Sequence, residues 1–117
     1  MSGALQLIPL ERFPLVEPGD DLAAMLLAAL ADNNLQLQPG DVLVIAQKIV
    51  SKAEGRYVRL AEVQPGPAAL ELAARAGKDP RQVELILRES REVLRVRPGV
   101  IIVEHRNGYV HANAGID

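Results

Sequence analysis

Hydrophobic positions in the first half of the chain form two apolar runs with a helical segment between them. Residues 5–8 (LQLI) are a short β-type run. In residues 21–33, apolar side chains recur at the i, i+3, i+4 spacing of an amphipathic helix, and Asp20-Asp21 can cap its start. Residues 41–46 (DVLVIA) are apolar without alternation, which is typical of a strand buried on both faces of a sheet. The pattern therefore predicts a strand, a helix and a central strand.

The second half predicts helices first and strands afterwards. Pro65-Gly66-Pro67 is its clearest break, and Asp79 before Pro80 is typical of a helix start. The expected elements are, in order, a polar segment at 47–55, a strand at 56–60, helices near 67–76 and 80–91, and strands at 93–96, 100–105 and 109–112. This order does not alternate as in a Rossmann fold. We therefore expect an α+β fold, with a mixed β-sheet packed with about three helices.

The length and composition indicate one globular domain with an aliphatic core. The chain has 117 residues, 49% of them hydrophobic, and aromatic residues are only 3% of it. It contains no cysteine, which excludes disulfides, thiolate zinc sites and cysteine nucleophiles. No apolar run approaches the length of a membrane span, and the start lacks the pattern of a signal peptide. We expect a cytoplasmic protein with no membrane partner.

Charge is distributed unevenly along the chain. The net charge is −2, which argues against a dedicated nucleic-acid-binding protein. Residues 1–47 carry one positive charge against six acids, whereas residues 48–117 carry twelve positive charges against nine acids. The second half therefore has the positive potential that suits an anionic ligand, provided that the charges converge.

The familiar catalytic signatures are missing, and the two histidines do not suggest a shared metal. There is no P-loop, no dinucleotide-binding glycine pattern, no zinc-protease motif and no nucleophile elbow. If Asn107-Gly108 is a two-residue turn, His105 pairs with Val110 and Glu104 pairs with His111. The two imidazoles would then lie on opposite faces of the hairpin, so we favour structural roles for them.

Two lysines follow directly after the predicted central strand. Lys48 and Lys52 are four residues apart, which places them on one side of either a helix or an extended segment. Ligands often bind at strand ends in α/β architectures, and two ammonium groups suit a phosphate. The alternative is a solvated loop whose lysines only add solubility, which is the more frequent role of surface lysine.

Two further features are unusual for surface segments. The loop around Pro14-Leu15-Val16-Glu17 holds apolar side chains among prolines, and these can wall a flat ring or pack over the sheet. Composition favours packing. Asp117 ends the chain after a turn-forming Asn-Ala-Gly, and its carboxylate suits Mg²⁺ or Mn²⁺. One carboxylate is not by itself a metal site.

Taken in order, four segments resemble one enzyme family. They are PLVEPGDDL (14–22), PGDVLVIAQKIVSKAEGR (39–56), KDPRQVELILRES (78–90) and RPGVIIVEHRNGYVHANAGID (97–117). Together they resemble the N-terminal half of the coenzyme F420-0:L-glutamate ligases, also called F420:γ-glutamyl ligases. The SKAEGR and NAGID blocks are the most specific part of this similarity, which covers nearly the whole chain.

The resemblance implies a reaction and its partners. Members of the family use GTP and a divalent metal, Mn²⁺ or Mg²⁺, to add L-glutamate to coenzyme F420-0. The first glutamate forms an amide, and later ones are joined through γ-carboxyl groups. The reaction proceeds through an acyl phosphate, which needs cations around the phosphates. The family is a homodimer with intertwined subunits.

The resemblance also implies site residues. The positions that match guanine-nucleotide contacts are Pro14, Leu15, Val16, Glu17, Gln47, Lys48 and Lys52, and the position that matches a metal ligand is Asp117. The family continues past this aspartate with a Ser-Asn pair and a second half. We therefore expect this chain to be the N-terminal portion of a longer ligase and to be inactive alone.

Two other functions stay open. A noncatalytic module derived from the ligase would bind guanine nucleotides or dock to a partner without turnover. An RNA-binding module would use Lys48, Lys52, Arg56 and Arg59, but the acidic composition and the scarcity of aromatic residues weigh against it.

Overall fold

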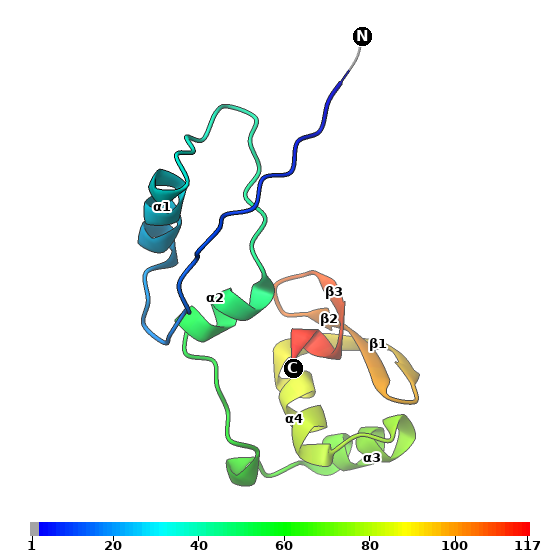
Figure 1. The fold of residues 1–117 in the computed structure, drawn as a ribbon. Helices are drawn as coiled ribbons and strands as arrows, with labels where there is room; N and C mark the ends of the chain where they lie inside the picture. Colours follow the sequence, from blue (N-terminus) through cyan, green and yellow to red (C-terminus); the bar gives the residue numbers. More distant parts are fainter. Residues whose placement is uncertain (1–2) are drawn as a thin grey trace. The chain divides into compact units, whose positions relative to one another are not determined.

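The structure is a computed structural model that describes residues 3–117, in two compact units (Figure 1). The N-terminal unit, Met1–Tyr57, contains helices α1 (Leu22–Asp32) and α2 (Gln47–Ala53). The elements of the C-terminal unit, Val58–Asp117, are η1 (Leu60–Glu62), α3 (Pro67–Ala76), α4 (Pro80–Glu89), β1 (Ser90–Arg97), β2 (Val100–His105), β3 (Val110–Ala112) and η2 (Asn113–Gly115). The α+β class predicted from the sequence is confirmed. No helix within residues 3–117 has both the length and the apolar character needed to cross a membrane.

The C-terminal unit holds a well-defined core between two helices and a three-stranded sheet. The strand order is β1-β2-β3, and both pairings are antiparallel. Alternate residues of β2, Ile101 and Val103, are fully buried and pack with Val83 and Ile86 of α4. Helix α3 contributes small side chains that allow close approach. The buried members of this core are Ala69, Leu72, Ala73, Ala76, Val83, Ile86, Ile101, Val103 and Ala114.

Helix α4 begins and ends through local sequence signals. Asp79 is its N-cap and accepts a hydrogen bond from the Arg81 backbone N–H at 2.9 Å, and Pro80 occupies the first turn. The Arg81 side chain also contacts the Asp79 carboxylate, with Nη2 2.7 Å from Oδ2. The helix ends at Glu89, two residues earlier than predicted, because the chain passes directly into β1 at Ser90.

The β2–β3 hairpin forms where the sequence predicts it, but its predicted register is wrong by one residue. Glu104 pairs with Val110 and Val103 pairs with His111. The His105 N–H donates to the Tyr109 carbonyl at 2.8 Å, so the loop has three residues, with Gly108 at φ +92°. The histidines therefore do not lie on opposite faces: Tyr109 stacks on His105 with ring centroids 4.4 Å apart and meets His111 edge-on at 6.4 Å.

The N-terminal unit is built around α1 and its two flanking loops. Asp21 is the N-cap and accepts a hydrogen bond from the Ala24 N–H at 3.1 Å, as the sequence predicts. At the other end, the Asn33 side chain clamps the chain that precedes the helix: its Oδ1 accepts from the Glu11 N–H, and its Nδ2 donates to the Glu11 carbonyl, both at 3.1 Å. Ala29 and Leu30 are the buried residues of α1.

Three strands predicted from the sequence are not formed. Residues 5–8, 41–46 and 56–60 are not in strands, and the only pairings within residues 3–117 are those of β1, β2 and β3. The apolar residues of 41–46 are accordingly exposed, with Val42 at 82% and Val44 at 92%. A strand exists only when a neighbour accepts and donates its backbone hydrogen bonds, and no described segment takes that place. The prediction that 1–117 is one domain remains a prediction.

Lowering the pH should remove the stabilisation that Asp79 gives to α4. Hydrogen bonds from the Arg81 side chain and backbone hold the pKa of Asp79 at about 2, below the ordinary value of 3.8. A carboxyl whose pKa is lowered by folding stabilises the protein above its unfolded-state pKa, and this contribution is lost as the pH falls through the folded-state value. Wild type should therefore be more stable than Asp79→Asn near neutral pH, and this difference should shrink between about pH 4 and about pH 2.

Denaturant titrations at several pH values measure that difference in the free energy of unfolding. Arg81→Ala removes the side-chain donors but keeps the backbone N–H, so the difference in stability between it and wild type should narrow over the same pH range by a smaller amount. A difference that stays constant from neutral to acidic pH would contradict the assignment.

Candidate functional site

The proline loop of the N-terminal unit is shaped by a tight turn at its end. Residues 17–20 form a β-turn with Pro18 at its second position and Gly19, at φ +89°, at its third, which is the type II pattern. The Asp20 N–H donates to the Glu17 carbonyl at 3.1 Å, and the Asp20 carboxylate accepts from the Glu17 N–H at 2.7 Å. The sequence led us to treat Asp20 as a helix cap. Asp21 performs that role, and Asp20 closes the turn.

The same turn occurs a second time in the N-terminal unit. In residues 38–41, the Asp41 N–H donates to the Gln38 carbonyl at 3.0 Å, and the Asp41 carboxylate accepts from the Gln38 N–H at 2.8 Å. Gly40 has a φ of +91°. The repeated Pro-Gly-Asp triplet at 18–20 and 39–41 is a sequence signal for this geometry that our sequence analysis did not use.

Side chains of the predicted nucleotide loop point in different directions. Val16 is buried, with 7% of its surface exposed, whereas Leu15 is 87% exposed. Pro14 and Glu17 are exposed as well. Val16 therefore anchors the loop, which is the packing role that composition favours. Leu15 stays available as an apolar contact for a flat ring.

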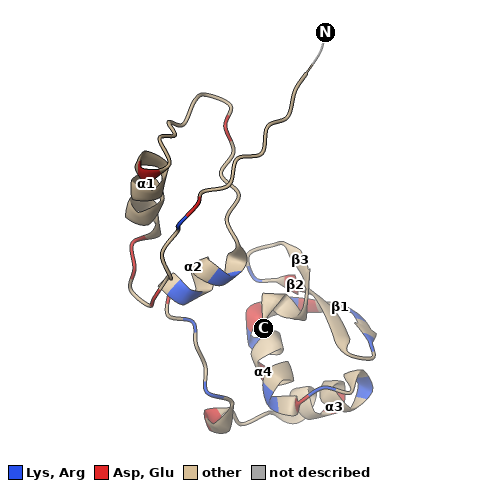
Figure 2. Ribbon diagram, viewed as in Figure 1, with Lys and Arg blue, Asp and Glu red and all other residues tan. Residues whose placement is uncertain are grey.

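Helix α2 carries both predicted lysines (Figure 2). The segment after residue 46 is helical, so Lys48 and Lys52 lie one turn apart on one side of α2. The helix ends in a Schellman motif: the Gly55 N–H donates to the Lys52 carbonyl at 3.0 Å, and the Arg56 N–H donates to the Ser51 carbonyl at 2.9 Å. Gly55 has a φ of +67°, which a residue with a Cβ adopts only under strain. The SKAEGR block is therefore a helix C-terminus with its cap.

One hydrogen bond joins the proline loop to the end of this helix. The Gly19 N–H donates to the Ala53 carbonyl at 2.9 Å, directly after Lys52. The two segments also lie close together at the C-terminal cap of α2. A Cβ added to Gly55 there would lie 3.7 Å from the Pro18 Cβ. The structure thus brings the loop that carries Pro14–Glu17 to the helix that carries the two lysines. Gln47 begins that same helix.

Asp117 lies in the C-terminal unit, directly after a strained turn. Asn113 and Ala114 both have a φ of +53°, and Gly115 has a φ of +73°. The Asn113 side chain accepts a hydrogen bond from the Ile101 N–H at 3.0 Å, and Ala114 is buried in the core. Ile116 packs against the same core. The backbone that leads to Asp117 is therefore fixed on both sides of the turn, while Asp117 itself is exposed.

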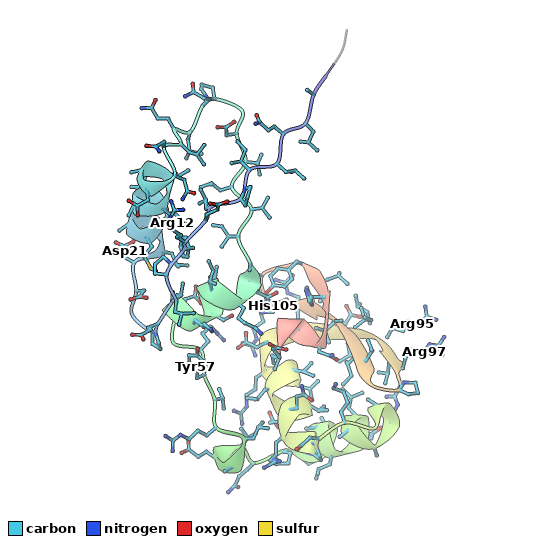
Figure 3. The ribbon with its side chains drawn as sticks, in the orientation of Figure 1. Arg12, Asp21, Tyr57, Arg95, Arg97 and His105 are labelled. Atoms are coloured by element: carbon cyan, nitrogen blue, oxygen red, sulfur yellow. The ribbon has the colours of Figure 1, made fainter. Side chains whose placement is uncertain are left out.

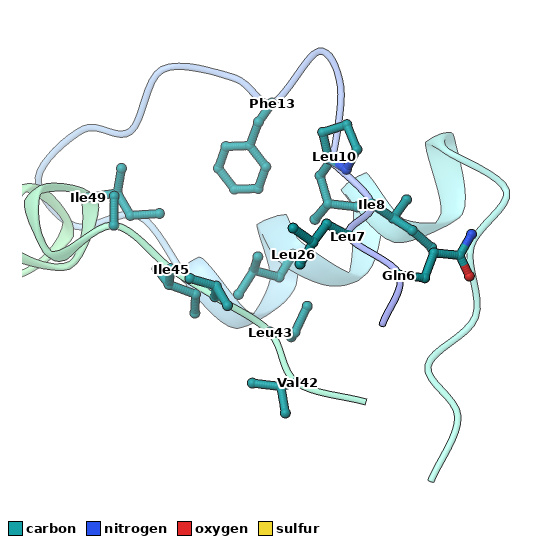
Figure 4. Close-up of a pocket in the computed structure, with 13 residues that line it drawn as sticks. Gln6, Leu7, Ile8, Leu10, Phe13, Leu26, Val42, Leu43, Ile45 and Ile49 are labelled. Atoms are coloured by element: carbon teal, nitrogen blue, oxygen red, sulfur yellow. The ribbon is translucent and has the colours of Figure 1, made fainter. Parts of the chain in front are cut away.

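The predicted site residues fall in different parts of the structure. All of the predicted nucleotide contacts lie in the N-terminal unit, and the predicted metal ligand lies in the C-terminal unit. Within residues 3–117, no group of three or more His, Asp or Glu side chains could hold a metal ion. The N-terminal unit also contains an apolar pocket of about 530 Å³, which sequence reasoning did not identify (Figure 4). Phe13, Leu26 of α1, Leu43 and Ile45 are among the residues that line it.

Comparison with known proteins defines the family. A family model described as F420-0:Gamma-glutamyl ligase matches residues 11–117, and the chain belongs to this family. It is 50% identical, over 113 residues, to the coenzyme F420:L-glutamate ligase of Methanothermobacter thermautotrophicus. It is 52% identical, over 110 residues, to the protein of that name from Methanopyrus kandleri, and 43% identical to that of Methanosarcina barkeri. These alignments cover 94–97% of this chain but only 41–45% of the relatives, so the chain spans less than half their length.

Asn113→Ala should destabilise the turn before Asp117. The substitution removes the acceptor of the Ile101 N–H and places an alanine at a φ of +53°. Leaving that partly buried amide without a partner should lower the free energy of unfolding by roughly 1–3 kcal/mol. Denaturant unfolding measures the change, and Asn107→Ala in the exposed hairpin loop is the matched control. Equal stabilities of the two variants would contradict the role given to the Asn113 side chain.

Proposed function

We propose that this chain is the N-terminal part of a GTP- and divalent-metal-dependent ligase that adds L-glutamate to coenzyme F420-0. The family membership over residues 11–117 supports the ligase class. The observation that carries the nucleotide assignment is the hydrogen bond from Gly19 to Ala53, because it holds the proline loop beside the lysine-bearing helix. The same family resemblance supports a homodimer and a cytoplasmic location.

The proposed chemistry has two steps. The γ-phosphoryl group of GTP passes to the acceptor carboxylate, giving GDP and an acyl phosphate. The amine of L-glutamate then attacks the acyl carbon, the new C–N bond forms, and phosphate and a proton are released. Both steps concentrate negative charge on phosphoryl oxygens, so cationic side chains that face those oxygens stabilise the transition states.

Lys52 and Lys48 are the residues that we assign to the phosphates. They lie on one side of α2, and Lys52 is half-buried near the turn that the Gly19 amide anchors. An ammonium group at the end of a helix held in this way has less freedom than one on a solvated loop. The loop Pro14–Glu17 would then contact the guanine base through its exposed residues, above all Leu15, while the buried Val16 holds the loop in place.

The described residues do not by themselves fit a metal centre. They offer Asp117 as one carboxylate at the predicted place, and a divalent cation of this kind takes about six oxygen ligands. We propose that Asp117 is one ligand of a Mn²⁺ or Mg²⁺ ion and that the other ligands come from substrate and from the rest of the ligase.

The proposal is tested by Lys52→Ala in a full-length ligase that carries these 117 residues as its N-terminal part. Loss of a charge-assisted contact to phosphate should raise the KM for GTP roughly 10- to 100-fold, while the circular dichroism spectrum stays unchanged. Steady-state kinetics with GTP as the varied substrate measure the effect. Arg95→Ala is the control, since this side chain extends from β1 away from the C-terminal unit (Figure 3). An unchanged KM in Lys52→Ala would overturn the phosphate assignment.

The two Pro-Gly-Asp turns provide a second, internally matched test. Alanine at Gly19 or Gly40 meets no neighbouring atom within 4 Å, so in both cases the cost comes from the left-handed backbone alone. Each variant should lose roughly 1–2 kcal/mol of stability. Only Gly19→Ala should also raise the KM for GTP, because only Gly19 is bonded to the lysine-bearing helix. If the two variants raise the KM equally, the loop has no specific role in nucleotide binding.

A further inference from the structure

Residues 42–46 leave apolar side chains uncovered on both sides of an extended segment. Val42 and Val44 are 82% and 92% exposed, Leu43 and Ile45, which alternate with them, are each 39% exposed, and all four residues line the apolar pocket. The residues of an extended segment alternate between two faces, so both faces of this one are apolar. A surface loop does not need such a pattern, but a strand in the interior of a sheet does.

A second segment of the same kind lines the same pocket. Leu5, Leu7 and Ile8 are 87%, 82% and 53% exposed, and residues 6–10 contribute to the pocket wall together with residues 42–46 (Figure 4). We call residues 5–8 and 42–46 the open segments. Neither forms a strand, although both have the composition of one.

The open segments also lack the features that protect exposed strand edges. Proteins keep such edges from pairing by placing charges, prolines or bulges along them. Residues 5–8 and 42–46 carry no charged side chain, and Figure 2 shows both stretches in tan. An uncharged apolar edge of this kind is a template for an added strand.

From this geometry we propose that the open segments are an incomplete sheet, completed by a strand from the part of the ligase that lies outside the matched region. More than half of each relative's length is outside that region, which is enough polypeptide to add a strand and cover two faces. A strand in the same polypeptide has a millimolar effective concentration at its partner. A separate molecule would need a millimolar concentration in solution to compete with it. The added strand would be uncharged and apolar on both faces, to match Val42–Ile45.

Strand addition would also affect the lysine-bearing helix. Residue 46 is the N-cap of α2, so a segment paired at 42–46 fixes where that helix starts. At its other end, the segment is preceded by the hydrogen-bonded turn at 38–41. The turn at 38–41 and the start of α2 thus fix both ends of 42–46. What this segment lacks is a neighbouring strand to pair with its backbone. This inference rests on the proposed function, in that the chain is the N-terminal part of a longer ligase, and on exposure, but it does not depend on GTP or metal binding.

The occupant can be identified by photo-crosslinking and amide exchange in the full-length ligase. A benzophenone amino acid replaces Val44 and, as the matched control, Leu70, which is an exposed residue of α3. Unfolding ¹⁴N- and ¹⁵N-labelled protein together and refolding the mixture before irradiation redistributes the subunits of a dimer, and so distinguishes links within one chain from links between copies. Hydrogen exchange of the residue 43–45 amides in unsubstituted protein provides a readout that requires no variant to fold.

We expect position 44 to cross-link, within one chain, to a peptide outside the matched region, and position 70 not to do so. The 43–45 amides should exchange about 100-fold more slowly in the full-length ligase than in the 117-residue chain. Cross-links to a second copy would overturn the proposal in favour of a self-association surface. Amides that exchange equally fast in both proteins would overturn it as well. Neither the cross-linking nor the amide exchange involves nucleotide. The strand proposal and the phosphate assignment that Lys52→Ala tests can therefore fail independently of each other.

Discussion

The hydrogen bond from the Gly19 amide to the Ala53 carbonyl joins two segments that are more than thirty residues apart in the sequence. The donor, Gly19, has left-handed backbone in the turn of the loop, and Gly55, two residues after the acceptor Ala53, has left-handed backbone in the cap of the helix. The turn before Asp117 also contains left-handed backbone, at Asn113, Ala114 and Gly115. Every predicted site segment is therefore placed by a chain reversal that ordinary L-residues adopt only at a cost of roughly 1–2 kcal/mol.

Local electrostatics favour the two lysines as the anion-binding groups of the N-terminal unit. Between Arg12 and Lys48 the chain has no positive charge, while Glu17, Asp20 and Asp21 lie in or beside the proline loop. The Asp20 carboxylate accepts a hydrogen bond from the Glu17 N–H but keeps its negative charge. A nucleotide at this loop would depend on α2 for compensating charge.

Sequence patterns located most helices and the hairpin, because those features depend on neighbours in the chain. The i, i+3, i+4 spacing and the Asp21 cap define α1, and Asp79-Pro80 defines the start of α4. The hairpin register was missed because Arg106 joins Asn107 and Gly108 in the loop, and a Gly in the left-handed conformation is compatible with either loop length. The apolar run at 42–46 was read as a buried strand. The apolar, β-branched composition of this run supports that interpretation. Strand pairing, however, needs a second strand from a distant part of the sequence, which the local pattern does not specify.

The sequence supplied the residues of the candidate site, whose roles stay predictions, but not the geometry that joins them. Lysine spacing indicated one side of α2, and the resemblance to the ligases supplied Pro14–Glu17 and Asp117. The link between Gly19 and Ala53 was not predictable, because a backbone amide and a backbone carbonyl leave no trace in residue type. The repeated Pro-Gly-Asp triplet was the one available signal of the turn that makes this link.

The stacking of Tyr109 on His105 gives the chain a built-in optical reporter. The sequence has no tryptophan and two tyrosines, one in each unit: Tyr57 closes the N-terminal unit, and Tyr109 belongs to the hairpin of the other. Tyr57 is 63% exposed, whereas Tyr109 lies nearly parallel to an imidazole, at an interplanar angle of 11°. Tyrosine emission therefore comes from two chemically different environments without interference from indole. Ultraviolet spectroscopy therefore reports on both halves of this chain at once, with no label attached.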